Sequence, residues 1–171
     1  MADVMTPEQR SRCMAAIKGK DTKPELIVRK YLFSRGLRFR VQVRKLSGNP
    51  DIVLPKYKTV IFVNGCFWHG HEGCKYFRLP KSNVEFWEAK IERNVARDVR
   101  NEAELKALGW RVVRVWECEI KTVAERKEYL KRLYDRIVNL VQLYPNESDT
   151  DETSIAAEPK SEHIYSRNNH S

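Results

Sequence analysis

Four residues near the middle of the chain have the types and spacing of a metal-binding site. Cys66, His71 and Cys74 form a Cys-x4-His-x2-Cys cluster, and Cys118 follows a predicted strand further along. Three thiolates and one imidazole suit structural zinc, which would cross-link a loop too irregular to hold itself. The alternative is that the cysteines are small buried apolar side chains and the histidine is a surface residue. Cys13 fits that alternative, whereas the other four favour zinc.

A second group of residues could hold magnesium and cleave a phosphodiester. Asp51 begins a short predicted strand, and Val63 lies near the end of the next one. Antiparallel pairing places the start of the first strand beside the end of the second. The Asp51 carboxylate and the Val63 carbonyl could then share one Mg²⁺ and leave positions for water and phosphate. The alternative is that Asp51 only closes a turn.

His69 is the candidate general base. It lies between two predicted zinc ligands, on a loop that the metal would make rigid, and a neutral imidazole can accept a proton from water at neutral pH. Glu25, in the first turn of a predicted helix, could orient that imidazole or the water. Spacing leaves two alternatives open: His69 could replace His71 as a ligand, and Glu25 could be only the acid of a capping box.

Helices and strands must position these groups, and the sequence predicts several. Thr6 and Thr22 each begin a predicted helix with a capping-box pattern and an early proline. The first helix extends to about Lys18, and the second ends at Gly36. Alternating or continuous apolar residues then predict a three-strand meander over residues 37–43, 51–54 and 59–63.

The second half of the chain predicts a crossover connection. Residues 64–82 are rich in Gly, Cys, His and aromatic residues and show neither helical nor strand periodicity. A long helix is predicted over 83–108, a strand over 110–116 and a last helix over 122–143. A strand, a long helix and another strand in succession predict an α/β fold with a parallel or mixed sheet.

The charge distribution favours a polyanionic partner. The chain has 171 residues and a net charge of +9. Residues 144–171 carry six acidic and two basic residues, so they contribute −4 and leave +13 on residues 1–143. We expect residues 1–143 to form one domain and the acidic, Ser/Thr/Asn-rich tail to be disordered. A basic body is typical of nucleic-acid binding, although charge alone also fits a basic protein without such a partner.

Several motifs of the chain together resemble those of a known family. The run VNGCFWHGH over residues 63–71, followed by Cys74, resembles the core signature of the very-short-patch repair (Vsr) endonucleases. The similarity continues in order from about residue 8 to residue 118. It includes MAAI at 14–17, Asp21-Thr22, Pro24-Glu25, Pro50-Asp51, EFW at 85–87, Lys90-Ile91, Asn94, Arg97-Asp98, GWRV at 109–112 and WEC at 116–118.

The resemblance implies both a fold and an activity. The fold would be a restriction-endonuclease-like core of the PD-(D/E)xK type, with a central mixed β-sheet flanked by helices and a structural zinc site. The enzyme would nick double-stranded DNA 5′ to the thymine of a T:G mismatch that arises when 5-methylcytosine deaminates. Two alternatives remain: a restriction-like enzyme that cuts both strands of matched DNA, and a zinc module that only binds DNA.

The resemblance also implies residue roles. Mg²⁺ would bind Asp51 and the Val63 carbonyl, with His69 as general base and Glu25 assisting. Zinc would bind the three cysteines and the histidine already named. An aromatic wedge would enter the DNA beside the mismatch, Met14 would enter from the minor groove, and two polar side chains would contact the mispaired bases. The wedge residues are Phe67, Trp68 and Trp87, and the base-contacting residues are Lys90 and Asn94. For Trp87 the alternative is packing against the sheet.

One position departs from the family pattern. Asn64 stands where many members carry histidine, so an amide that cannot transfer protons would assist there. The Glu-x-Lys half of the restriction-enzyme motif is also absent, as it is in the family. We expect a monomer in the bacterial cytoplasm, bound to the nucleoid, with a functional link to a cytosine-5 methyltransferase and to mismatch repair proteins. The chain has no apolar N-terminal segment typical of secretion.

Overall fold

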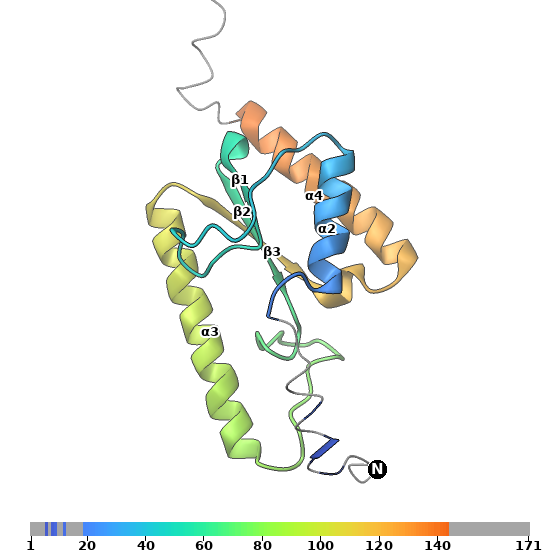
Figure 1. The fold of residues 1–171 in the computed structure, drawn as a ribbon, viewed down its shortest axis with the longest axis vertical. Coiled ribbons are helices and arrows are strands. Elements are labelled where there is room, and N and C mark those ends of the chain that lie inside the picture. Colours follow the sequence, from blue (N-terminus) through green and yellow to red (C-terminus); the bar gives the residue numbers. More distant parts are fainter. Residues whose placement is uncertain (1–5, 7, 10–11, 13–18, 144–171) are drawn as a thin grey trace, which may run out of the picture.

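A three-stranded mixed sheet forms the centre of the protein (Figure 1). The computed structural model describes residues 6, 8–9, 12 and 19–143. Strand β1 (Ile52–Leu54) pairs antiparallel with β2 (Thr59–Asn64), and β2 pairs parallel with β3 (Arg111–Trp116). β2 is therefore the central strand, and its continuous apolar sequence fits a strand that is covered on both faces.

Helices cover both faces of this sheet. Helices α2 (Lys23–Ser34) and α4 (Val123–Leu143) lie together on one face, and α3 (Val84–Ala107) lies on the other (Figure 1). Ile61 packs into the core with α2 and α4, whereas its neighbour Val60 packs against Leu105 of α3. This alternation follows the two-residue period of a strand. The predicted α/β class, with a mixed sheet between helices, is confirmed.

The capping signals in the sequence produce the predicted helix starts. The Thr22 hydroxyl and the Glu25 carboxylate form a reciprocal capping box at the start of α2. Thr6 and Gln9 make the same reciprocal pair of bonds, with N···O distances of 2.9 and 3.3 Å. Most of the helix predicted up to Lys18 lies outside the described residues, and so does Met14.

The strand predicted over residues 37–43 is wrong. Only Arg40 makes a bridge, exchanging two 2.8 Å backbone hydrogen bonds with Val53 at the edge of the sheet. Leu37 packs into the core beside α2 and α4, whereas Val43 packs into the core beside α3. The segment therefore crosses the sheet edge from one face to the other, and Gln42 with φ +52° turns it out of extended geometry. The three-strand meander reduces to the β1–β2 hairpin.

The crossover from β2 to β3 matches the sequence prediction. β2 leads through an irregular loop into α3, and Gly109 with φ +75° ends that helix before β3. Two short 3₁₀ helices, Pro55–Tyr57 and Glu117–Ile120, complete the connections. None of the described helices is long and apolar enough to cross a membrane. Residues 144–171, the predicted tail, lie outside the described residues.

Candidate active site

Asp51 and Val63 meet at the open end of the β1–β2 hairpin. The backbone N–H of Val63 donates a 2.7 Å hydrogen bond to Oδ2 of Asp51. In a strand, the N–H and C=O of one residue point to the same side. The Val63 carbonyl therefore also faces the edge at which Asp51 lies. The two groups predicted to share a metal are adjacent, and the bond between them holds the Asp51 side chain in place.

The surroundings of Asp51 disfavour its negative charge. Burial, with a smaller contribution from the nearby charge of Glu25, raises the pKa of Asp51 to about 6 against the lowering effects of the Val63 hydrogen bond, Arg29 and His69. A carboxylate that is buried beside another carboxylate fits a cation site, because a cation removes the like-charge repulsion. His69 is also close enough for its charge to lower the pKa of Asp51.

Two adjoining cavities open around these residues. One of about 310 Å³ is lined by His69, Asn64 and the side chains of α3 that face them. The other, of about 450 Å³, is lined by Asp51 and Glu25. Asn49 lines both cavities, so they meet at this residue. The predicted base and the predicted metal-binding carboxylate therefore line two neighbouring cavities that share Asn49.

Glu25 has a structural role that sequence reasoning left open. Its side chain is 4% exposed; Oε1 accepts a 2.7 Å hydrogen bond from the Thr22 hydroxyl, and Oε2 accepts one of 2.8 Å from Arg29. Arg29 also donates to the backbone carbonyl of Asp51 at 3.2 Å. The capping-box reading of Glu25 is confirmed. Through Arg29, the same carboxylate also fixes the start of β1, where Asp51 lies.

His69 is oriented by a carboxylate on α3. Its Nδ1 lies 2.5 Å from Oδ2 of Asp98. Burial alone would raise the pKa of Asp98, but the hydrogen bond and charge of His69, together with Arg97 and Arg114, lower it. When His69 is in its neutral form, the Asp98 carboxylate can accept a hydrogen bond from Nδ1–H, which leaves Nε2 as the acceptor nitrogen of the imidazole. The pair thus presents a basic nitrogen in a fixed orientation.

The role of Asp98 was missed by sequence reasoning, which gave this residue no function. A usable signal existed, because Asn94 and Asp98 are one turn apart on the long predicted helix and therefore share a face. Asn94 donates a 3.0 Å hydrogen bond to the Trp68 carbonyl, and Asp98 binds the next side chain, His69. One face of α3 thus holds two consecutive residues of the irregular loop.

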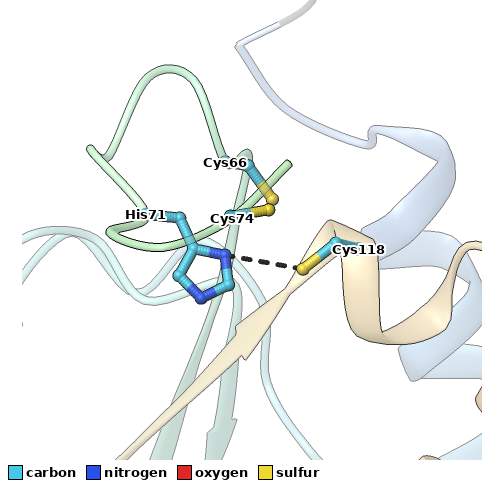
Figure 2. A group of neighbouring side chains, drawn as sticks. All are labelled: Cys66, His71, Cys74 and Cys118. Atoms are coloured by element: carbon cyan, nitrogen blue, oxygen red, sulfur yellow. Dashed lines mark hydrogen bonds between the residues drawn. The ribbon is translucent and has the colours of Figure 1, made fainter. Parts of the chain in front are cut away.

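The four predicted metal ligands converge (Figure 2). Cys66, His71 and Cys74 come from the loop after β2, and Cys118 comes from the turn after β3. Their donor atoms all lie within 4.8 Å of one another, and Nδ1 of His71 is 3.5 Å from the Cys118 sulfur. The His71 ring stacks on Trp116 with centroids 4.0 Å apart and planes 1° apart. The donors and their spacing fit one tetrahedral ion that ties the loop to β3.

The predicted wedge residues form one aromatic cluster. The ring centroid of Phe67 lies 5.1 Å from that of Trp68 and 5.4 Å from that of Trp87. The ammonium of Lys90 lies 5.7 Å from the Trp68 ring and 5.8 Å from the Trp87 ring. Phe86, which is 53% exposed, packs on Trp87. The rings are only half buried and lie outside both core clusters, so Trp87 does not pack into the sheet core.

Comparison with known proteins decides the family. The model for a family described as DNA mismatch endonuclease Vsr matches residues 2–75. The DNA mismatch endonuclease Vsr of Escherichia coli strain K12 is 47% identical over 121 residues, which cover 71% of this chain and 77% of that protein. The chain belongs to the Vsr DNA mismatch endonuclease family.

Nicking enzymes are further relatives of this Vsr-family protein. The type II nicking enzyme V.NmeAIP of Neisseria meningitidis is 49% identical over 141 residues, which cover 82% of this chain and 100% of the relative. V.XorIIP of Xanthomonas oryzae pv. oryzae is 47% identical over 135 residues, which cover 79% and 98%. This Vsr-family chain is therefore an endonuclease that acts on DNA.

Gly70 lies against helix α3 in the site of this Vsr-family protein, and this close packing predicts the effect of adding a side chain there. Its φ is +59°, and a Cβ there would lie 3.0 Å from Val95 and 3.1 Å from Ile91. We expect Gly70→Ala to lower the free energy of unfolding by about 2–3 kcal/mol through backbone strain and overpacking. Gly73→Ala is the matched control, because Gly73 has φ +68° but nothing within 4 Å of a Cβ.

Urea unfolding of both variants separates the two causes. The control should lose only the left-handed backbone penalty of about 1 kcal/mol. Equal losses in the two variants would mean that the loop moves away from α3 at no cost, and that the packing of Gly70 on Ile91 and Val95 does not hold the site together.

Proposed function

We propose that this protein nicks double-stranded DNA 5′ to the thymine of a T:G mismatch produced by deamination of 5-methylcytosine. The observation that carries the proposal is His69, held 2.5 Å from Asp98 on a loop that also supplies three residues of a Cys₃His cluster. A neutral, oriented imidazole next to a metal-binding carboxylate is suited to hydrolysis of a phosphodiester. The helix-flanked mixed sheet is consistent with a restriction-endonuclease-like core.

Magnesium is the proposed ion at Asp51, with the Val63 carbonyl as a second oxygen ligand. Both are hard oxygen donors, which Mg²⁺ prefers, and the buried carboxylate lies beside the charge of Glu25. When bound, Mg²⁺ neutralises charge on the phosphodiester and makes water more acidic. Arg29 and Glu25 hold the start of β1 and so position Asp51.

Zinc is the proposed ion of the Cys₃His cluster, because three thiolates and one imidazole form a closed structural zinc set. The ligands Cys66 and His71 flank His69 in the chain, and Cys118 joins them from the end of β3. The cluster therefore fixes the backbone that carries the base.

Each polar side chain then has a distinct part in the reaction. Nε2 of His69 accepts a proton from the attacking water, and Asp98 keeps the proton of Nδ1 in place. Asn64 lines the same cavity and can donate a hydrogen bond to a phosphate oxygen, but its amide transfers no proton. The chemistry thus depends on one imidazole, where many relatives carry a second histidine.

The aromatic cluster supplies the proposed preference for a mismatch. Phe67, Trp68 and Trp87 would enter the base stack, with Met14 on the minor-groove side, and Lys90 and Asn94 would contact the mispaired bases. Insertion of apolar rings costs a few kcal/mol of unstacking. A T:G wobble pair is weaker than a Watson–Crick pair, so the cost is smallest at the mismatch. A monomer suits a single-strand nick near sites of a companion cytosine-5 methyltransferase.

Cleavage of one duplex in three forms tests the proposal. The duplexes carry T:G, T:A or C:G at one position, in a panel of flanking sequences, with each strand labelled separately. We expect Mg²⁺-dependent cleavage of the thymine strand alone, 5′ to the mismatched T. Equal cutting of both strands in the matched duplex would favour a restriction-like enzyme. Uncut T:G duplexes in every context, with zinc-loaded protein, would defeat the proposal.

Removing the carboxylate partner of His69 should slow the chemical step. We expect Asp98→Asn to lower the single-turnover nicking rate about 100-fold, because the uncharged amide can also donate a hydrogen bond to Nδ1 and so permits the tautomer whose Nε2 carries the proton. DNA affinity should change little. Glu102→Gln is the matched control: Glu102 lines the same cavity from the same helix, but its partners are Arg114 and Lys106. If both variants lose rate equally, Asp98 has no specific effect on His69.

A further inference from the structure

The two flanks of helix α3 carry opposite charges. Ile91 and Leu105 are buried, and Asn94 and Asp98 contact the site loop, so these residues define the inward face. At 100° per residue, basic residues occupy one side of that face and acidic residues the other. The basic side holds Lys90, Arg93, Arg97 and Arg100, followed by Glu104 in the last turn, and the acidic side holds Glu85, Glu88 and Glu92, followed by Lys106.

From Lys90 to Arg100 the basic flank has no acidic residue of its own. The helical neighbours of Arg93 at three and four residues are Ala89, Lys90, Ala96 and Arg97, so none is acidic. Among the described residues, no carboxylate lies within 4 Å of Lys90, Arg93 or Arg100. Like charges at this spacing destabilise a helix by about 0.2–0.5 kcal/mol per pair. The row therefore costs stability unless anions from outside the described fold neutralise it.

In the described part of the chain, Arg97 is the one member of the row with a carboxylate within 4 Å, and that contact is weak. Glu104, four residues after Arg100, instead accepts a hydrogen bond from Ser47. The guanidinium of Arg97 lies 3.6 Å from Oδ1 of Asp98, whose other oxygen binds His69, and the Arg97 side chain is 51% exposed. Most of its hydrogen-bonding capacity is therefore free. Arg97 also lines the 310 Å³ cavity together with His69.

The row is continuous with the active site at two points. Lys90 lies over the aromatic cluster, and Arg97 borders the cavity of His69. From residue 90 to residue 100 the helix rises about 15 Å. One DNA strand advances about 3.4 Å per nucleotide, so the row matches about four nucleotides that pass the aromatic rings and His69.

We propose that Arg93, Arg97 and Arg100 form a phosphate track that binds the backbone of one DNA strand beside the active site. The inference rests on the proposed function only in that DNA reaches His69. Guanidinium groups bind phosphate oxygens without reading bases. The track therefore adds affinity that is independent of sequence and strongly dependent on salt, and it sets the direction in which the strand crosses the cavity.

The salt dependence of DNA binding tests the track. A triple variant, R93Q/R97Q/R100Q, is compared with the wild-type chain for binding to a matched duplex in Mg²⁺-free buffer at several NaCl concentrations. Each lost phosphate contact should reduce the slope of log K against log[salt] by about 0.9, so the slope should fall by two to three. The matched control removes three exposed charges from α4, on the other face of the sheet: K127Q/K131Q/R132Q.

The salt dependence of the variants decides whether the three arginines bind DNA phosphates. An unchanged slope in the triple variant, or an equal fall in the control, overturns the track. Should the triple variant fail to fold, R93Q alone changes an exposed side chain and should lower the slope by about 0.9. Binding to matched DNA does not require nicking. If no protein nicks T:G duplexes while the slope falls as expected, the mismatch proposal fails and the track stands.

Discussion

Cys118→Ala is expected to abolish zinc binding and, with it, nicking. Cys118 is the one member of the cluster that lies outside the loop, so its sulfur joins the loop to the end of β3. Structural zinc contributes about 10–16 kcal/mol of binding free energy in small domains, which is as large as the whole stability of a typical protein. Zinc content should fall from one ion per chain to nearly none, and the unfolding midpoint should fall by at least about 10 °C.

Cys13→Ala is the control, because Cys13 is the one cysteine that the sequence does not predict as a ligand. It should retain one zinc ion per chain and the wild-type unfolding midpoint. Metal analysis after dialysis and thermal unfolding by circular dichroism measure both quantities. A Cys118→Ala protein that keeps a full zinc ion and its stability would show that the four converging donors are not a zinc site, and the proposed support for His69 would be lost.

Asp51→Asn should stabilise the protein while it abolishes nicking. The pKa of Asp51 is raised from 3.8 to about 6, so ionisation is harder in the folded state than in the unfolded state. Such an acid destabilises the fold increasingly as pH rises from about 4 to 6. The shift corresponds to roughly 3 kcal/mol at most. Because an amide still accepts the Val63 hydrogen bond, the variant should gain about 2 kcal/mol at pH 7.

The pH dependence identifies the cause of that gain. Between pH 7 and pH 5 the wild-type carboxyl becomes protonated in the folded state, so the stability difference should shrink by about half. Urea unfolding in Mg²⁺-free buffer measures it, and Asp135→Asn, which changes an exposed acid on α4, is the control. Nicking should fall at least about 1,000-fold. A variant less stable than wild type at pH 7 would show that Asp51 serves the fold rather than a cation.

Local signals in the sequence were sufficient for most elements of the fold. The capping box of Thr22 and Glu25, the continuous apolar run of β2 and the glycine that ends α3 each depend on a few neighbouring residues. The prediction of a strand over residues 37–43 was wrong because the apolar residues of this segment pack into two separate core clusters on opposite faces of the sheet. Only the tertiary arrangement reveals that requirement.

The contacts of the candidate site also fall into two kinds: some follow from nearby sequence, and others depend on the tertiary fold. Asp51 lies beside Val63 because hairpin pairing makes that contact from nearby sequence. His69 and Asp98 are 29 residues apart, and their contact depends on how the long helix lies across the loop. The family resemblance named both residues but gave Asp98 no role. The extents of the catalytic domain and the tail, and the part of Met14, stay predictions.

Residues 37–43, which cross from one core cluster to the other, have a consequence for solubility. A strand at the edge of a sheet exposes unpaired backbone groups that can recruit a strand from another molecule. Here the Arg40–Val53 bridge occupies the outer edge of β1, and the turn at Gln42 leads the chain away at once. The edge is therefore closed by a segment too bent to extend the ladder. The β1 edge of this short sheet is thus protected from pairing with another molecule.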